Sequence, residues 1–349
     1  MMIRIGIFAA IVSLLGAAPA WPEPAEDALK EALGLQEAGR LKEAIAQFDR
    51  AIKINPRVAR AYLHRGDAYA ELGDDERAVK DYGEAIRLDA KDAEAYYNRG
   101  NAYRRLGQRE RALQDYAAAI GLAPENGDIY LDRGTTHYAM GQYPSALRDY
   151  NEAIRLDPKD ADAYYNRGNT YARMGNKERA IDDYGQALSL NGELVEAYYN
   201  RGIAYADLGR YEEAVRDYTE VVKAYPESPE AYYNRGLAYY RLDKSEQALE
   251  NYNEAIRLNP KDPEAIYNRG LAYGRLGKHD YAARDFTEVI VLMPRNAEAH
   301  GQRGLVRLRQ GRDQEGEADL KKAFQLDAKL KQKLQPLIDE AKRKTNVKP

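Results

Sequence analysis

The chain has 349 residues, of which 44% are hydrophobic and 31% are charged, and its formal net charge at pH 7 is −3. That near-neutral balance gives no electrostatic reason to expect a nucleic acid or an anionic membrane surface as a partner. The absence of cysteine excludes disulfides, thiolate metal sites and cysteine nucleophiles. Tyrosine is unusually common, with 29 Tyr against 4 Phe and 1 Trp, which is more than burial of apolar surface alone would select.

Residues 1–20 have the pattern of a secretory signal peptide. Arg4 supplies the positive start, residues 5–18 are uncharged and mostly apolar, and a cleavage site of small residues ends at Ala20. The apolar stretch is short for a membrane span, which needs about 20 residues. We expect cleavage, a mature chain that begins at Trp21, and export to the periplasm or the exterior of a bacterial cell. An uncleaved anchor or a first helix is the alternative interpretation.

From residue 25 to residue 330 the sequence repeats every 34 residues without insertion or deletion. One column of the repeat is a glycine that closes a turn, replaced once by Asp243. The nine units are 25–58, 59–92, 93–126, 127–160, 161–194, 195–228, 229–262, 263–296 and 297–330. A strict period of this length predicts a solenoid, in which each unit buries its apolar face against its neighbours.

Each unit contains the pattern of two helices. In the third unit, Tyr96, Gly100 and Tyr103 fall on one face at helical spacing, and Gly107 is placed to end that helix. The apolar face of the second helix is formed by three residues: Ala112, Tyr116 and Ala119. Because Gly100 and Ala112 are small, the two helices are expected to approach closely there.

Seven columns of the third unit together resemble the tetratricopeptide repeat: Tyr96, Gly100, Tyr103, Ala112, Tyr116, Ala119 and Pro124. The resemblance extends over all nine units, which is nearly the whole predicted mature chain. It implies an all-α fold, a right-handed superhelical solenoid of helix-turn-helix repeats in which the first helix of each pair lines a concave groove. Members of the family mostly bind peptides, helices or loops of other proteins in that groove.

Two charged columns depart from the family pattern, which usually has an apolar residue at the arginine position. In an antiparallel hairpin folded about Gly107, Arg99 and Asp115 lie level with each other. We therefore predict a structural ladder of Arg–Asp pairs, within a unit or between neighbouring units, and favour this over a catalytic role. The pairs are Arg99 and Asp115, Arg133 and Asp149, Arg167 and Asp183, Arg201 and Asp217, and Arg269 and Asp285.

A tyrosine and an asparagine that follow the first core tyrosine point to another side of the first helix, which in the family faces or borders the groove. An Asn side chain donates and accepts hydrogen bonds at once, which suits an extended peptide backbone. Exposed tyrosine offers a rigid apolar surface with a polar tip. The column resembles the asparagine ladder of O-GlcNAc transferases; the alternative is that it braces adjacent helices. The candidates are Tyr97, Asn98, Tyr165, Asn166, Tyr199, Asn200, Tyr233, Asn234, Tyr267 and Asn268.

One helical turn further on, a column changes from polar to aliphatic along the chain: Asp67, Asn101, Thr135, Asn169, Ile203, Leu237, Leu271 and Leu305. A ligand with an apolar stretch is expected to prefer residues 195–296, at Ile203, Leu237 and Leu271. The alternative is that these side chains are contacts between successive helices. Charged columns flank the same helices, and the basic one is a further groove candidate: Arg105, Arg173, Arg241 and Arg275. The acidic one lies nearer the helix starts: Glu94, Asp162, Glu196, Glu230 and Glu264.

The sequence carries no motif for catalysis, cofactor binding or metal binding. The four histidines are scattered over different units without the spacing of metal ligands, and no phosphate-binding or nucleophile motif is present. Residues 331–349 are predicted to form a helix that caps the last unit before a frayed end. Its apolar side consists of Leu334, Leu337, Ile338 and Ala341. Too few residues remain outside the repeats for an enzyme domain, so we predict no enzyme activity, cofactor or metal.

The sequence therefore predicts a non-enzymatic scaffold or adaptor in the cell envelope, holding a peptide or protein segment of unknown identity in its groove. No nucleic-acid partner and no stable membrane insertion after cleavage are expected, and the open ends of a regular array allow self-association. The alternative is a carbohydrate-associated envelope factor that serves polysaccharide export or peptidoglycan enzymes. Tyrosine and asparagine also suit sugars, which stack on aromatic rings and bond to amides.

Overall fold

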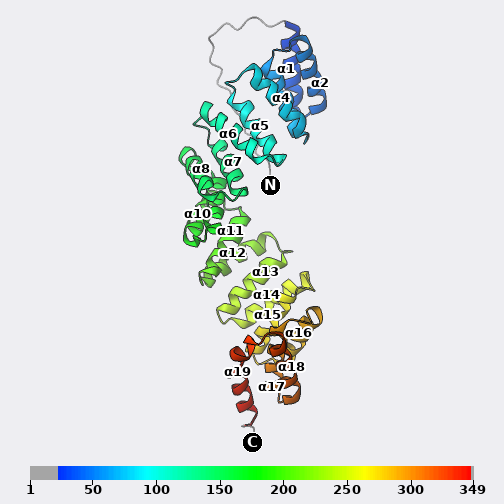
Figure 1. Cartoon of the computed structure of the whole chain (residues 1–349), viewed down its shortest axis with the longest axis vertical. Coiled ribbons are helices and arrows are strands. Elements are labelled where there is room, and N and C mark those ends of the chain that lie inside the picture. The colour runs from blue at the N-terminus through cyan, green and yellow to red at the C-terminus, as the bar shows by residue number, and fades with distance from the viewer. Residues whose placement is uncertain (1–22, 347–349) are drawn as a thin grey trace. The chain divides into compact units, whose positions relative to one another are not determined.

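The structure, a computed structural model, describes residues 23–346, and every regular element among them is an α-helix (Figure 1). The described chain divides into two compact units, the first ending at Leu156 and the second beginning at Asp157. The predicted signal peptide and Trp21 lie outside the described residues. The expected all-α repeat fold is confirmed, since helices follow one another as packed pairs in each unit.

The first unit contains four antiparallel helix pairs. Their helices are α1 (Glu23–Glu37), α2 (Leu41–Ile54), α3 (Ala59–Glu71), α4 (Asp75–Leu88), α5 (Ala93–Arg105), α6 (Arg109–Leu122), α7 (Gly127–Ala139) and α8 (Tyr143–Leu156). Each second helix also packs against the first helix of the next pair, and neighbouring first helices touch. The pairs therefore stack as the period predicts.

The second unit contains five pairs and one more helix. Its helices are α9 (Ala161–Arg173), α10 (Lys177–Leu190), α11 (Val195–Asp207), α12 (Tyr211–Ala224), α13 (Pro229–Arg241), α14 (Ser245–Leu258), α15 (Pro263–Arg275), α16 (His279–Leu292), α17 (Ala297–Arg309), α18 (Asp313–Leu326) and α19 (Lys329–Asn346). From α3 to α18 the first helix of a pair always has 13 residues and the second 14.

Local sequence signals fix both ends of α5. Asp92 caps α5 by accepting a hydrogen bond from the backbone N–H of Ala95, which satisfies a donor that has no partner inside the helix. At the other end Gly107 has φ +75°, a left-handed conformation that glycine adopts without steric cost. Asp243 takes the same conformation with φ 59°, so the turn survives the only exception in the glycine column.

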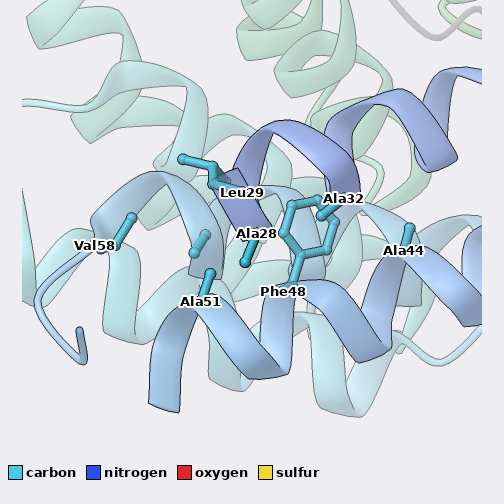
Figure 2. Close-up of a cluster of buried hydrophobic side chains, with 8 residues drawn as sticks. Ala28, Leu29, Ala32, Ala44, Phe48, Ala51 and Val58 are labelled. Carbon is cyan, nitrogen blue, oxygen red and sulfur yellow. The ribbon is translucent and has the colours of Figure 1, made fainter. Parts of the chain in front are cut away.

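In every pair from α3 and α4 to α15 and α16, the core is a large ring packed over a glycine. Tyr116 is fully buried in α6, and a Cβ added to Gly100 would lie 2.8 Å from its ring. Glycine is therefore required where the two helices cross, because any side chain would push the ring away. In the first pair Phe48 takes the ring position and packs with Ala28, Ala32 and neighbouring side chains (Figure 2).

The last helix, α19, covers the final pair by packing against α17. It begins at Lys329, two residues before the predicted start, and continues to Asn346. Leu330, Leu334 and Ile338 are buried in the cluster that it shares with α17 and α18. Leu337 was expected on the packing side but is 36% exposed. Helical geometry explains the difference, because Leu330, Leu334, Ile338 and Ala341 form one stripe at steps of three and four.

The close approach of Gly100 to the Tyr116 ring predicts opposite effects for two glycine substitutions in the first unit. Gly100→Ala should destabilise the fold by about 1–3 kcal/mol, because its Cβ would overlap the buried Tyr116 ring. Gly121→Ala, in α6 with no atom within 4 Å of its Cβ, should stabilise by up to about 1 kcal/mol through helix propensity. Urea unfolding followed by circular dichroism measures both. Equal effects would mean that the crossing does not require glycine.

Candidate functional site

Every predicted Arg–Asp pair is joined by hydrogen bonds inside its own helix pair. Arg99 donates from Nε and Nη2 to the two carboxylate oxygens of Asp115, at 2.7 and 2.8 Å. The same two-bond arrangement joins four further predicted pairs: Arg133 with Asp149, Arg167 with Asp183, Arg201 with Asp217 and Arg269 with Asp285. Such bidentate contacts fix the orientation of both groups.

The ladder pairs are largely removed from water. The Asp183 side chain is 6% exposed and that of Arg167 is 20% exposed. The hydrogen bond to Asp183 raises the pKa of Arg167, so this guanidinium stays charged. Four of these arginines also lie 5.5–5.7 Å from the ring of the first core tyrosine of their helix, as Arg167 does over Tyr164, whereas Arg269 lies over Tyr273 at 6.0 Å. All members are therefore occupied by structural contacts.

Two arginines of the column also reach back to the preceding repeat, a contact not expected from the sequence. Arg269 donates from Nη1 to the Asn253 side chain at 3.0 Å, and Arg303 donates to Thr287 at 3.1 Å. Both acceptors stand 16 residues before their arginine. One guanidinium thus holds together two successive second helices, and the polar residues at that spacing were the available signal.

The tyrosine and asparagine columns meet each other between neighbouring first helices. Asn200 donates from Nδ2 to the Tyr165 hydroxyl at 3.1 Å, Asn234 to Tyr199 at 3.0 Å, and Asn268 to Tyr233 at 3.1 Å. We call the surface that carries Tyr165, Tyr199, Tyr233, Tyr267 and the four asparagines from Asn166 to Asn268 in the second unit the ladder face. These side chains are neither fully buried nor fully exposed.

The ladder face combines a bracing contact with unused acceptors. The amide nitrogens of Asn200, Asn234 and Asn268 are engaged, as the bracing alternative requires. Within residues 23–346 no donor reaches their Oδ1 atoms, so each amide retains an acceptor for an outside N–H group. In the first unit, Tyr97 instead donates to Asp132 at 2.7 Å, and Asn98 donates to Asp67 at 3.0 Å.

The column that changes from polar to aliphatic has a structural role in its polar half. Tyr116 donates its buried hydroxyl hydrogen to Asn101 at 2.6 Å, and Tyr184 donates to Asn169 at 2.7 Å. Asn169 also accepts from Asn200, so it joins the core tyrosine to the ladder face. From the sequence the polar half of this column was expected only as groove surface. The signal for its structural role is the constant 15-residue spacing between each polar residue and a core tyrosine.

The aliphatic half of the same column interrupts this network. Leu237 replaces the acceptor for Tyr252, whose hydroxyl is buried and has no hydrogen-bond partner in the described chain. Ile203 is 37% exposed. Leu271 is partly buried and packs against the cluster of Ala282, Phe286 and Val306, as the helix-contact alternative supposed. Ile203 and Leu237 belong to none of the core clusters of the described residues.

Two members of the basic column are held in contacts between repeats. Arg105 donates to Asp75 at 2.8 Å. Arg275 donates to the Tyr240 carbonyl at 2.7 Å and pairs with Asp243. Arg105 and Arg275 therefore brace successive turns. Arg173 and Arg241 are both exposed.

Other surfaces of the described chain offer less chemistry. Among residues 23–346 no three metal-ligating side chains gather at one point, and none of the helices there has the length and apolar character to cross a bilayer. A recess of about 500 Å³ next to α16 is lined by Asp280, Arg284, Arg307 and Arg312. Arg307 and Arg312 are already paired with carboxylates, so the recess carries no strong charge of one sign.

Hairpins of constant length, stacked by glycine, alanine and tyrosine columns, define a helical repeat protein. The chain belongs to the tetratricopeptide repeat family. A family model described as TPR repeat matches residues 35–73, 66–107 and 134–175. Models described as tetratricopeptide repeat match residues 93–126, 161–194, 199–263 and 251–284. Together they cover more than half of the chain.

Solved structures share this fold at low sequence identity. The C-terminal part of a TPR repeat-containing protein from Cytophaga hutchinsonii is 21% identical with a TM-score of 0.60, covering 68% of this chain and 98% of that one. A tetratricopeptide repeat protein from Parabacteroides merdae is 22% identical with a TM-score of 0.50, covering 71% and 98%. PilF from Pseudomonas aeruginosa is 18% identical with a TM-score of 0.52, covering 59% and 94%. No curated protein matches the sequence.

The ladder predicts that an unpaired buried arginine destabilises the fold. Asp183→Ala should cost about 3 kcal/mol, the low end for removing one partner of a buried pair, since water reaches part of Arg167. Glu152→Ala removes a pair with Arg155 in which the side chains are 46% and 59% exposed, and it should leave the melting temperature almost unchanged. Thermal unfolding followed by circular dichroism compares them. If both variants melt like the unmodified chain, the ladder does not stabilise the fold.

Tyrosine ionisation predicts loss of stability in alkali. Burial raises the pKa of Tyr116, Tyr218 and Tyr252 well above the ordinary value of 10, and raises that of Tyr233 to about 12. The folded chain retains these protons above pH 10 while the unfolded chain releases them, so stability is complete below pH 10 and falls through pH 12. The part of the phenolate absorbance that comes from these buried rings should appear only as helicity is lost. Ionisation of every tyrosine with helicity retained would contradict this.

Proposed function

We propose that this protein is a scaffold that holds an extended segment of another protein on its ladder face. Tetratricopeptide repeats in general serve as protein-interaction scaffolds, which supports the general class. The observation that carries the specific proposal is the row of unused Asn200, Asn234 and Asn268 carbonyl oxygens, one in each repeat. An extended backbone presents its N–H groups at regular intervals and can donate to such a row.

A peptide fits these contacts better than a sugar. The ring centroids of Tyr165 and Tyr184 lie 5.9 Å apart, and Tyr199 and Tyr233 each contact a second-helix tyrosine at 6.1 Å. Part of each ring is therefore engaged in a contact inside the protein, which reduces the surface for stacking of a carbohydrate. The proposed location is the cell envelope, and it rests on the sequence pattern of residues 1–20.

Site-specific photo-crosslinking tests the proposed face. We expect p-benzoylphenylalanine at position 203, on the first helix α11, to crosslink to one linear segment of a partner in extracts of cells that produce the chain. The control places the same group at position 291 on the second helix α16, where Val291 is 73% exposed. Mass spectrometry of the crosslinked peptides identifies the partner segment. Equal crosslinking from both positions, or from position 291 alone, would contradict binding on the ladder face.

A further inference from the structure

The repeats provide an internal comparison that separates what the fold needs from what it tolerates. In the repeats that contain Asn101 and Asn169, the buried tyrosine of the second helix donates to that asparagine on the first helix. In the repeat that contains Leu237, the equivalent Tyr252 is 0% exposed, and its hydroxyl has no partner in the described part of the chain. A buried hydroxyl without a partner destabilises the fold, because it has lost its hydrogen bonds to water and gained none in return.

An asparagine at position 237 would remove this cost, because Asn101 shows that the same position can accept the hydrogen bond. The next repeat has no unsatisfied hydroxyl, since it carries Phe286 in place of a tyrosine, and this ring packs with Leu271. Tyr252 with Leu237 is thus a combination that folding alone disfavours. A local rule broken at a cost to the fold points to selection for another property of the surface.

Charged residues stand on both sides of these aliphatic residues along their helices. Glu196, Glu230 and Glu264 are the second residues of α11, α13 and α15, are exposed, and form no ion pair with any described residue. Glu230 helps to raise the pKa of Tyr199, and Glu264 that of Tyr233, which places both carboxylates beside the ladder face. At the other end of these helices Arg241 is exposed, while Arg275 is paired with Asp243.

Acidic residues at helix starts also stabilise the helix dipole. That role accounts for one carboxylate in each helix, but it does not account for the aliphatic change beside three of them. An apolar strip bordered by unpaired carboxylates is complementary to a segment that carries both apolar and basic side chains.

We propose that Ile203, Leu237 and Leu271 bind the apolar side chains of an extended segment, and that Glu196, Glu230 and Glu264 pair with its basic side chains. This inference rests on the proposed function and names the chemistry of the partner. The asparagine oxygens hold the backbone of any extended segment, whereas the strip and the carboxylates select among segments. Selection by charge weakens as salt screens the carboxylates.

Three short fluorescein-labelled peptides test the preference by fluorescence anisotropy on the full chain. The first carries leucine and lysine between glycine and serine, the second has serine in place of leucine, and the third has glutamate in place of lysine. We expect the first to bind on the order of tenfold tighter than either of the others, with an advantage over the glutamate peptide that shrinks in high salt. Equal affinity of the three peptides would overturn the inference.

Variants separate binding from folding. Leu237→Asn should weaken the leucine–lysine peptide about tenfold and raise the melting temperature, because Tyr252 gains an acceptor. Tyr252→Phe should raise or preserve the melting temperature without changing affinity. Val291→Asn, at an exposed site on α16, should change neither. If Leu237→Asn lowers the melting temperature, Leu237 is a packing residue and the inference is overturned.

The proposed function and this inference fail in different ways. Crosslinks from position 203 to a partner segment, together with equal affinities for the three peptides, would leave the scaffold and remove the selectivity. Absence of both crosslinks and peptide binding would overturn the two proposals together.

Discussion

The contact between a first-helix glycine and the aromatic ring of the second helix is the constraint on which the seven pairs from α3 and α4 to α15 and α16 depend. Gly100 lets the Tyr116 ring cross α5 at a distance that no side chain would permit. Because the ring passes over the glycine, its hydroxyl reaches Asn101 beyond it. The same approach brings Arg99 level with Asp115. Core packing, the buried ion pair and the polar link to the ladder face thus follow from one close crossing.

The Arg–Asp pairs add specificity at a position where apolar packing would also serve. A buried pair recovers its desolvation cost only when its geometry is good, and here two hydrogen bonds of 2.6–2.9 Å join each predicted pair. The arginine contacts to Asn253 and Thr287 extend this control to the preceding repeat. Gly83 and Gly185 stand at the same spacing before Arg99 and Arg201 and offer no side-chain acceptor, so this directional contact joins some successive repeats and not others.

The polar and aliphatic halves of the column that follows the ladder asparagines have different roles in the same helical framework. Asn101 and Asn169 satisfy a buried tyrosine and tie the core to the surface. Leu237 cannot accept a hydrogen bond, and the Tyr252 hydroxyl is left without a partner. A difference of this kind is visible only because the repeats provide equivalent positions in equivalent surroundings. It is the strongest indication in the described chain that part of the surface serves a ligand.

The sequence by itself determined the fold, because a 34-residue period with Gly107, Ala112 and Tyr116 in fixed columns admits only stacked helix pairs. It also determined the Arg99–Asp115 pairing, since residues eight positions before and after a tight turn must lie level. Tertiary structure decided what the polar columns do. Whether Asn200 faces a ligand or a neighbour depends on the distance between successive first helices, which no local pattern encodes, and the structure places its amide nitrogen 3.1 Å from Tyr165. The unsatisfied hydroxyl of Tyr252 is likewise recognised only in the folded structure, where the helix that carries Leu237, 15 residues earlier in the sequence, is packed against the helix of Tyr252.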